Sequence, residues 1–156
     1  MVNARIATSA EQPINRDGAV SQYAGEEAEL VGMNASGELV MADAASGTAV
    51  NAVGILAAPV TDPADYSQVP EVQDIVISKR EIIGENRIAF AKYGALIVNS
   101  DEDWGFTPGQ PVYLGLGGGF TQTKPSAAGE IVQVVGMATG DGEEIFLDVE
   151  SGYSTV

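Results

Sequence analysis

The chain has 156 residues, which is long enough for one domain with its own core, and 22 Asp and Glu against seven Lys and Arg give a net charge of −15 at pH 7. It contains no Cys and no His, which excludes disulfides, thiolate metal sites and nucleophiles paired with His. The charge makes nucleic acid and anionic membranes poor partners. The acidity has two interpretations: adaptation to high salt, where the screening length falls to about 3 Å at 1 M, or an ordinary acidic protein.

Residues 1–25 show no hydrophobic periodicity and mix Gln, Pro, Asn and Ser. We interpret them as an extended N-terminal arm that does not fold alone. They contain no apolar run, so we expect no signal peptide there, and no stretch of the chain approaches the length of a membrane-spanning helix. Ile6 and Ile14 stand apart in this arm, and Pro13 stiffens the approach to Ile14. We therefore expect Ile6, Pro13 and Ile14 to be candidate contacts with a partner.

Residues 26–156 read as short apolar runs separated by glycines, with one helical signal. Ten runs are typical of strands, and their number and spacing predict an all-β barrel or sandwich. The runs are 28–33, 38–42, 52–57, 74–78, 87–92, 95–99, 111–116, 120–123, 131–138 and 144–149. Asp62, Pro63 and Asp65 predict one or two helical turns within 61–72.

In two of these runs apolar and polar residues hardly alternate, whereas in the last run they alternate regularly. Runs 74–78 and 131–138 are therefore expected to be buried on both faces. In the last run Ile145, Leu147 and Val149 fall on one face, with Phe146 as the exception among polar residues on the other. That run predicts a half-buried strand.

The segment 30–57 aligns without gaps on 112–139 at a shift of 82 residues. Both segments contain a strand, a Gly turn, a second strand, a small-residue loop and a strand that ends in Val-Gly. The identical pairs are Gly37/Gly119, Ala45/Ala127, Gly47/Gly129, Val50/Val132, Val53/Val135 and Gly54/Gly136. The domain can therefore consist of two related halves, about 26–60 and 108–150, or be a glycine-rich β protein with chance similarity. A Gly inside the third strand predicts a bulge, a bend or close backbone approach.

Parts of the first half resemble a family of viral proteins. The residues that carry this are LVMAD (39–43), AVGILA (52–57) and AFAKYGALIVNSDEDW (89–104). They resemble the head decoration proteins of lambda-type tailed phages over about residues 30–104. The later stretches PGQPVYLGLGGGFTQT and VVGMAT are instead similar to capsid-stabilising proteins of other tailed viruses. The resemblance implies a small β-barrel that docks on an icosahedral shell, often as a trimer and through an extended N-terminal arm.

Three motifs carry possible chemistry, and each has a structural interpretation as well. Asn99, Asp101 and Asp103 alternate as at the start of a calcium loop, but Gly105 and Gln110 do not fit that loop, so a solvated acidic turn is the alternative. GLGGG (115–119) suggests a phosphate loop, but it precedes a strand rather than a helix, which favours a hairpin turn. The carboxylate pairs 101/103 and 143/144 lack the apolar surroundings that a catalytic pair needs.

Trp104 and the basic cluster are the remaining candidates. Trp104 is the only tryptophan, and it either covers one end of the barrel or anchors a subunit interface. Lys79 and Arg80, with Arg87, form the only basic cluster. They pair either with a neighbouring subunit's carboxylates or with local acids.

Together these observations favour a structural protein without enzymatic activity, metal or cofactor. We expect it to decorate the capsid surface of a tailed virus that infects a halophilic host. The expected partner is the major capsid protein shell, and the expected oligomer is a homotrimer. One alternative is a receptor- or glycan-binding module of a viral tail fibre or spike. A second is a carboxylate-dependent hydrolase, against which the lack of His and Cys weighs.

Overall fold

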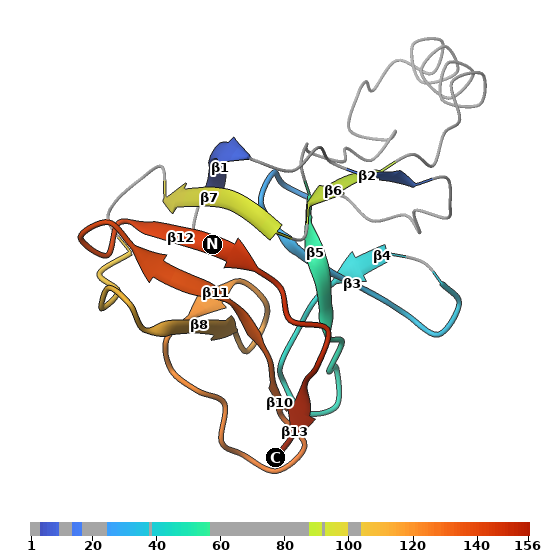
Figure 1. Ribbon diagram of the computed structural model, residues 1–156. Coiled ribbons are helices and arrows are strands. Elements are labelled where there is room, and N and C mark those ends of the chain that lie inside the picture. Colours follow the sequence, from blue (N-terminus) through green and yellow to red (C-terminus); the bar gives the residue numbers. More distant parts are fainter. Residues whose placement is uncertain are drawn as a thin grey trace, which may run out of the picture.

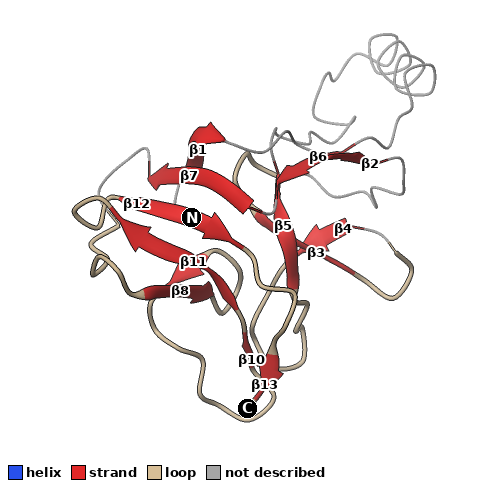
Figure 2. Ribbon diagram, viewed as in Figure 1, coloured by secondary structure: helices blue, strands red, loops and turns tan. Residues whose placement is uncertain are grey.

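Every regular element in the described part of the chain is a β-strand (Figure 2). The computed structural model describes residues 4–9, 14–16, 25–37, 39–56, 88–91, 93–99 and 104–156. Three antiparallel sheets form there, with strand orders β1-β7-β12-β11-β8-β9, β2-β6-β5-β3-β4 and β10-β13. The six-stranded sheet curls into half a barrel (Figure 1). The protein is therefore all-β in these ranges.

The strands are short, as expected where Gly and Pro interrupt apolar runs. The bounds of the first seven are β1 Ala4–Ser9, β2 Ile14–Arg16, β3 Leu30–Met33, β4 Leu39–Met41, β5 Ala52–Leu56, β6 Ile88–Ala91 and β7 Tyr93–Asn99. Those of the others are β8 Pro111–Leu114, β9 Phe120–Thr121, β10 Ile131–Val132, β11 Val134–Thr139, β12 Glu144–Asp148 and β13 Ser154–Thr155.

Most of the expected runs coincide with strands, and three strands were not expected. The run 131–138 corresponds to two strands, β10 and β11, because the pairing partner changes between them. β1, β2 and β13 have too little apolar pattern to be recognised from sequence. The run 74–78 and the helical turns expected within 61–72 lie outside the described residues.

One main hydrophobic core lies between the two large sheets. Its buried members include Leu30 and Ile55 from the five-stranded sheet and Ile97, Leu114 and Ile145 from the six-stranded sheet. A smaller cluster of Val31, Leu39 and Leu56 is also fully or almost fully buried. Because Leu30 and Val31 are adjacent but belong to different clusters, β3 is buried on both faces.

The alternation predicted for the last run is confirmed, whereas burial on both faces of 131–138 is wrong. Ile145, Leu147 and Val149 are buried, and Asp148 and Glu150 are exposed. In β11, Met137 is 45% exposed. A bulge between Val134 and Gly136 lets Val135 and Gly136 both lie inside, so the buried residues do not alternate although the strand has an outer face.

The two predicted halves share a strand pairing register, which is what related halves require. The residue pairs of hairpin β3–β4 correspond to those of hairpin β8–β9 when 81 is added to each residue number. The third strands β5 and β11 correspond at a shift of 82, and each pairs with its hairpin through a bulge, at Val53 in one and Val135 in the other. One extra residue between the hairpin and the third strand therefore separates the second half from the first.

Gly136 shows why glycine is needed beside this bulge. A Cβ built there would stand 2.5 Å from the carbonyl oxygen of Phe146 and 2.9 Å from Cγ2 of Ile145. The neighbouring strand β12 therefore approaches too closely for any side chain. This agrees with the close approach predicted for a Gly within the third strand.

The N-terminal segment is extended, but it is docked on the fold rather than projecting from it. β1 pairs with β7, and β2 pairs with β6, so the segment contributes one edge strand to each large sheet. Ile6 packs against the main core, and its N–H donates to Oε1 of Glu27 at 3.1 Å. In the described residues, the expected arm is extended and pairs with the edges of β7 and β6 of the same chain; its other residues lie outside the described ranges.

A buried polar side chain ties the two large sheets together. Gln133 is 1% exposed, and its Oε1 accepts the N–H of Ala52 at 2.7 Å. Its Nε2 donates to the carbonyl oxygens of Ala52, at 2.8 Å, and Glu150, at 2.7 Å. Ala52 begins β5, so one amide links the segment between β10 and β11 to the opposite sheet.

Candidate functional site

The outer face of the six-stranded sheet carries a row of apolar side chains. Met137 lies opposite both Pro111 and Phe146, and Phe146 also lies opposite Leu96. Residues opposite one another in neighbouring strands share a face, so this row crosses β8, β11, β12 and β7. All four side chains are at least partly exposed.

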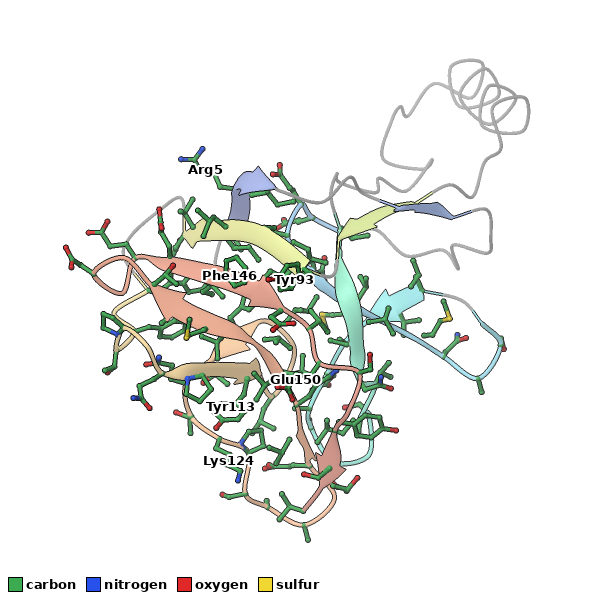
Figure 3. All side chains as sticks on the ribbon, in the orientation of Figure 1. Arg5, Tyr93, Tyr113, Lys124, Phe146 and Glu150 are labelled. Carbon is green, nitrogen blue, oxygen red and sulfur yellow. The ribbon has the colours of Figure 1, made fainter. Side chains whose placement is uncertain are left out.

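Two tyrosines and a valine widen this row into a patch. Tyr113 lies opposite Val134, and Tyr93 lies opposite Asp148. Tyr93 is 53% exposed, and its ring meets that of Phe146 edge to face, with centroids 5.4 Å apart (Figure 3). We call this patch the outer apolar face; its members are Tyr93, Leu96, Pro111, Tyr113, Val134, Met137 and Phe146.

Few charges accompany the outer apolar face. Among the described strands of this sheet, Arg5 and Glu144 lie on either side of Val98 in one row, and Asp148 lies beside Tyr93. One positive and two negative side chains are a small part of the charged residues of a chain with a net charge of −15. The acidic surface is therefore interrupted here, and this face suits contact with another macromolecule.

Trp104 lies in an aromatic cluster against the main core. Its ring stacks on that of Phe106, with centroids 5.4 Å apart and planes at 16°, and meets Phe120 edge to face at 5.7 Å. All three pack against buried core residues. The indole Nε1 is buried and has no hydrogen-bond partner in the described ranges.

A cavity of about 260 Å³ lies beside this cluster. Its apolar lining comes from distant parts of the sequence: Ala4, Ala28, Leu30, Met41, Trp104 and Phe120. Gly117, Gly118 and Gly119 of the β8–β9 turn form another wall. Gly118 is close to Met41, since a Cβ built on it would be 3.1 Å from the Met41 sulfur.

Three glutamates, Glu26, Glu27 and Glu29, also line this cavity. Glu27 accepts the Ile6 N–H, and Oε2 of Glu29 accepts the Glu26 N–H at 2.9 Å. Ala28, between them, has a φ of +64°, a left-handed conformation that is uncommon without a glycine. The Ala28 N–H donates to the Leu56 carbonyl at 2.8 Å, which fixes this turn beside the cavity.

Asp43 holds the glycine turn in place. Its Oδ1 accepts the N–H groups of Ala45, at 2.8 Å, and Gly117, at 2.7 Å, and its Oδ2 accepts the hydroxyl of Thr48 at 2.7 Å. Burial alone would raise the pKa of Asp43, but the hydrogen bonds from Ala45, Thr48 and Gly117 outweigh it and hold the pKa below the usual 3.8. The carboxylate of the first half therefore positions a cavity wall of the second.

Only some of the residues expected to contact a partner are among the described residues. Ile6 is half-buried in β1, and Ile14 pairs through its backbone with Phe90. Trp104 lies at the cavity, which the sequence analysis did not predict. Pro13, Lys79 and Arg80 lie outside the described residues, so no contact between them and Trp104 can be described.

The chemical motifs give one confirmation. GLGGG is the turn of a hairpin, because Tyr113 and Leu114 pair with Thr121 and Phe120 on either side of it. The acidic residues 101–103 lie outside the described residues. In the ranges that the structure describes, no group of three His, Cys, Asp or Glu is placed to hold a metal ion.

The outer apolar face escaped the sequence analysis, although one signal pointed to it. Phe146 was the exception in the alternation of its strand, with an aromatic ring on the polar side. Met137 would have been the second signal, but without knowledge of the bulge its side of the strand could not be assigned. The pairing of the two across β11 and β12 is visible only in the fold.

No helix among the described residues is long and apolar enough to cross a membrane. Comparison of the chain with protein-family models, curated proteins and solved structures finds no match. The similarity to head decoration and capsid-stabilising proteins therefore rests on the short residue motifs alone.

Proposed function

We propose that the protein is a structural decoration protein that binds the outside of the assembled capsid of a tailed virus. Its partner is the major capsid protein shell, and it acts as a homotrimer in a high-salt environment. The proposal combines the motif resemblance of residues 30–104 with the acidic composition and the all-β fold.

The observation that carries the proposal is the outer apolar face. Monomeric proteins rarely keep a large apolar patch in contact with water without a binding role. Tyr, Phe and Met are enriched in protein interfaces, and here Tyr93, Phe146 and Met137 lie together on one sheet. A rigid sheet presents these side chains in one fixed arrangement, which suits the repeated surface of a shell.

Trimerisation would strengthen a contact that is weak in one copy. Linking several contacts raises the overall affinity by roughly 10²–10⁴ when all of them can form together. A three-fold position on a shell offers three equivalent contacts. High salt would also screen the repulsion between neighbouring acidic copies.

A glycan-binding tail module is the second candidate, and Tyr93 favours it. Its ring is 53% exposed and stands against Phe146, and an exposed aromatic ring can serve as a platform for a sugar. Such a module would be present at few copies per particle and would bind host glycans rather than shells.

The test is binding to purified empty shells in high salt, together with the copy number on intact particles. We expect hundreds of copies per particle, and weaker shell binding for Tyr93→Ser/Met137→Ser. The matched control is Leu116→Ser/Tyr153→Ser, whose side chains are 55% and 52% exposed and lie off the outer apolar face. A few copies confined to tails would support the tail module, and equal binding by both variants would show that this face is not the shell contact.

A further inference from the structure

The sulfur chemistry of this chain is confined to methionine. The chain has four Met and no Cys, so no thiol competes for an oxidant. Among the described methionines, Met137 is 45% exposed and Met41 is 36% exposed, whereas Met33 packs against a buried cluster. An oxidant in solution attacks the thioethers that it can reach and converts them to sulfoxides. Of the described methionines, Met137 is therefore the one that an oxidant reaches most readily.

Met137 also occupies the middle of the outer apolar face. It lies opposite Pro111 on one side and Phe146 on the other. β11 is paired with β12 along one edge and with β8 along the other, so its backbone cannot turn this side chain away from the face. Side chains directly opposite one another have Cβ atoms about 4.5–5.5 Å apart. A change of polarity at Met137 therefore acts at the centre of the face, next to both neighbours.

Oxidation at this position should change binding rather than folding. A sulfoxide replaces a flexible apolar side chain by a polar one, which disrupts apolar contacts between proteins. Met137 is not part of the buried core, so water hydrates the new oxygen in the free protein and the fold loses little stability. In a contact this oxygen loses its water, and the side chains of Pro111 and Phe146 offer it no hydrogen-bond donor. An unsatisfied acceptor weakens the contact.

We propose that Met137 is an oxidation site that controls binding by the outer apolar face. Hydrogen peroxide transfers one oxygen atom to the Met137 sulfur: an S–O bond forms, the O–O bond breaks, the thioether is oxidised to the sulfoxide and the peroxide is reduced to water. The oxidised face then binds its partner more weakly. The proposal rests on the proposed function, because it takes the outer apolar face as the contact with the shell.

The experiment measures binding of the full-length protein to purified empty shells in high salt. The protein alone is treated with hydrogen peroxide, and the peroxide is removed before untreated shells are added, so that only this chain is oxidised. Peptide mass spectrometry assigns each added oxygen atom to a methionine. We expect Met137 to be oxidised before Met41, and the oxidised protein to bind shells about tenfold more weakly, as one unsatisfied polar group predicts. Its urea unfolding midpoint should stay unchanged.

Variants assign the effect to one sulfur atom. Met137→Leu has no thioether, so its affinity for shells, whatever its value, should be the same before and after peroxide. Met41→Leu keeps Met137 and should lose affinity on treatment as the natural chain does. Met137→Gln carries a polar group of similar length and should bind weakly without any peroxide. Its matched control is Leu116→Gln, which places the same group at a 55% exposed position off the outer apolar face and should bind normally.

Two results would overturn this proposal while the proposed function stands. The first is undiminished shell binding by protein whose Met137 is fully oxidised. The second is an equal loss of affinity on peroxide treatment by Met137→Leu and the natural chain, which would place the sensitive group elsewhere. Failure of the proposed function looks different, because the untreated protein would then not bind shells at all, and the present proposal would fail with it.

Discussion

Replacing Gln133 by Leu should destabilise the fold more than any exposed Gln→Leu substitution. Gln133 is the buried polar side chain of the described core, and its amide serves the N–H and C=O of Ala52 and the C=O of Glu150. Leu has a similar size, so the main effect is the loss of three hydrogen bonds rather than of packing.

The size of the effect follows from how buried those groups are. The two hydrogen bonds to Ala52 are buried, whereas the one to Glu150 is only partly buried and can be replaced by water. Leaving a buried polar group unsatisfied costs about 1–3 kcal/mol. The two unsatisfied Ala52 groups should therefore lower the free energy of unfolding by about 2–6 kcal/mol. Burial of the more apolar Leu side chain offsets part of this loss, so we expect a net destabilisation of about 3 kcal/mol.

Urea unfolding at fixed high salt, followed by Trp104 fluorescence, measures this change. With a slope of about 1–3 kcal/mol per M, the midpoint should fall by about 1–3 M. Gln110→Leu is the control, because residue 110 is exposed. Its free energy of unfolding should change by no more than about 0.5 kcal/mol. Equal midpoints for the two variants would refute the role of Gln133 as a tie between the sheets.

Three further predictions concern stability. Gly136→Ala should cost about 1–3 kcal/mol or more in urea unfolding because its Cβ meets the Phe146 carbonyl, whereas Gly152→Ala, with open space around it, should be near neutral; equal effects would contradict the close approach. Asp43 has a lowered folded-state pKa, so its stabilising contribution is present above about pH 4 and is lost as pH falls through the folded pKa; Asp43→Asn should remove this part of the acid dependence, and an unchanged pH profile would contradict it. The unfolding midpoint should rise from 0.1 to 3 M NaCl because salt screens the net charge of −15, and a flat or falling midpoint would count against a high-salt protein.

Local pattern was sufficient to predict the class of fold, because short apolar runs between glycines form strands wherever they pack. The alternation of Ile145, Leu147 and Val149 gave the buried face of β12 directly. It could not give the faces of β11, because one bulged residue, Val135, changes which neighbours lie inside. The bulge depends on the partner strand, so it is a property of the tertiary structure.

The N-terminal strands failed to show in sequence for a different reason. Polar, irregular residues can form an edge strand when a free edge is available, because the backbone supplies the hydrogen bonds. β1 and β2 pair with β7 and β6, which lie far along the sequence. The described N-terminal residues therefore extend the protein's own sheets, and their side chains carry no signal of it.

The candidate site was partly predictable at Trp104 and not at all at the cavity. Of the two interpretations of Trp104, its packing with Phe106 against the main core agrees with the one in which it covers the core. The cavity combines Ala4, Glu26 to Leu30, Met41 and the glycine turn, and no local pattern connects these segments.

Individual hydrogen bonds join segment 26–60 to segment 108–150, and this explains why Asp43 matters to the site. In the described residues the two large sheets share a core but no continuous strand pairing. Instead the Ala44 N–H donates to the Gly115 carbonyl at 3.1 Å, and the Ala44 carbonyl accepts the Ile131 N–H at 3.0 Å. Asp43 adds the bond to Gly117 next to this link. A cavity wall in segment 108–150 is thus positioned by a residue of segment 26–60, which is why a change at Asp43 should disturb the wall formed by Gly117 to Gly119.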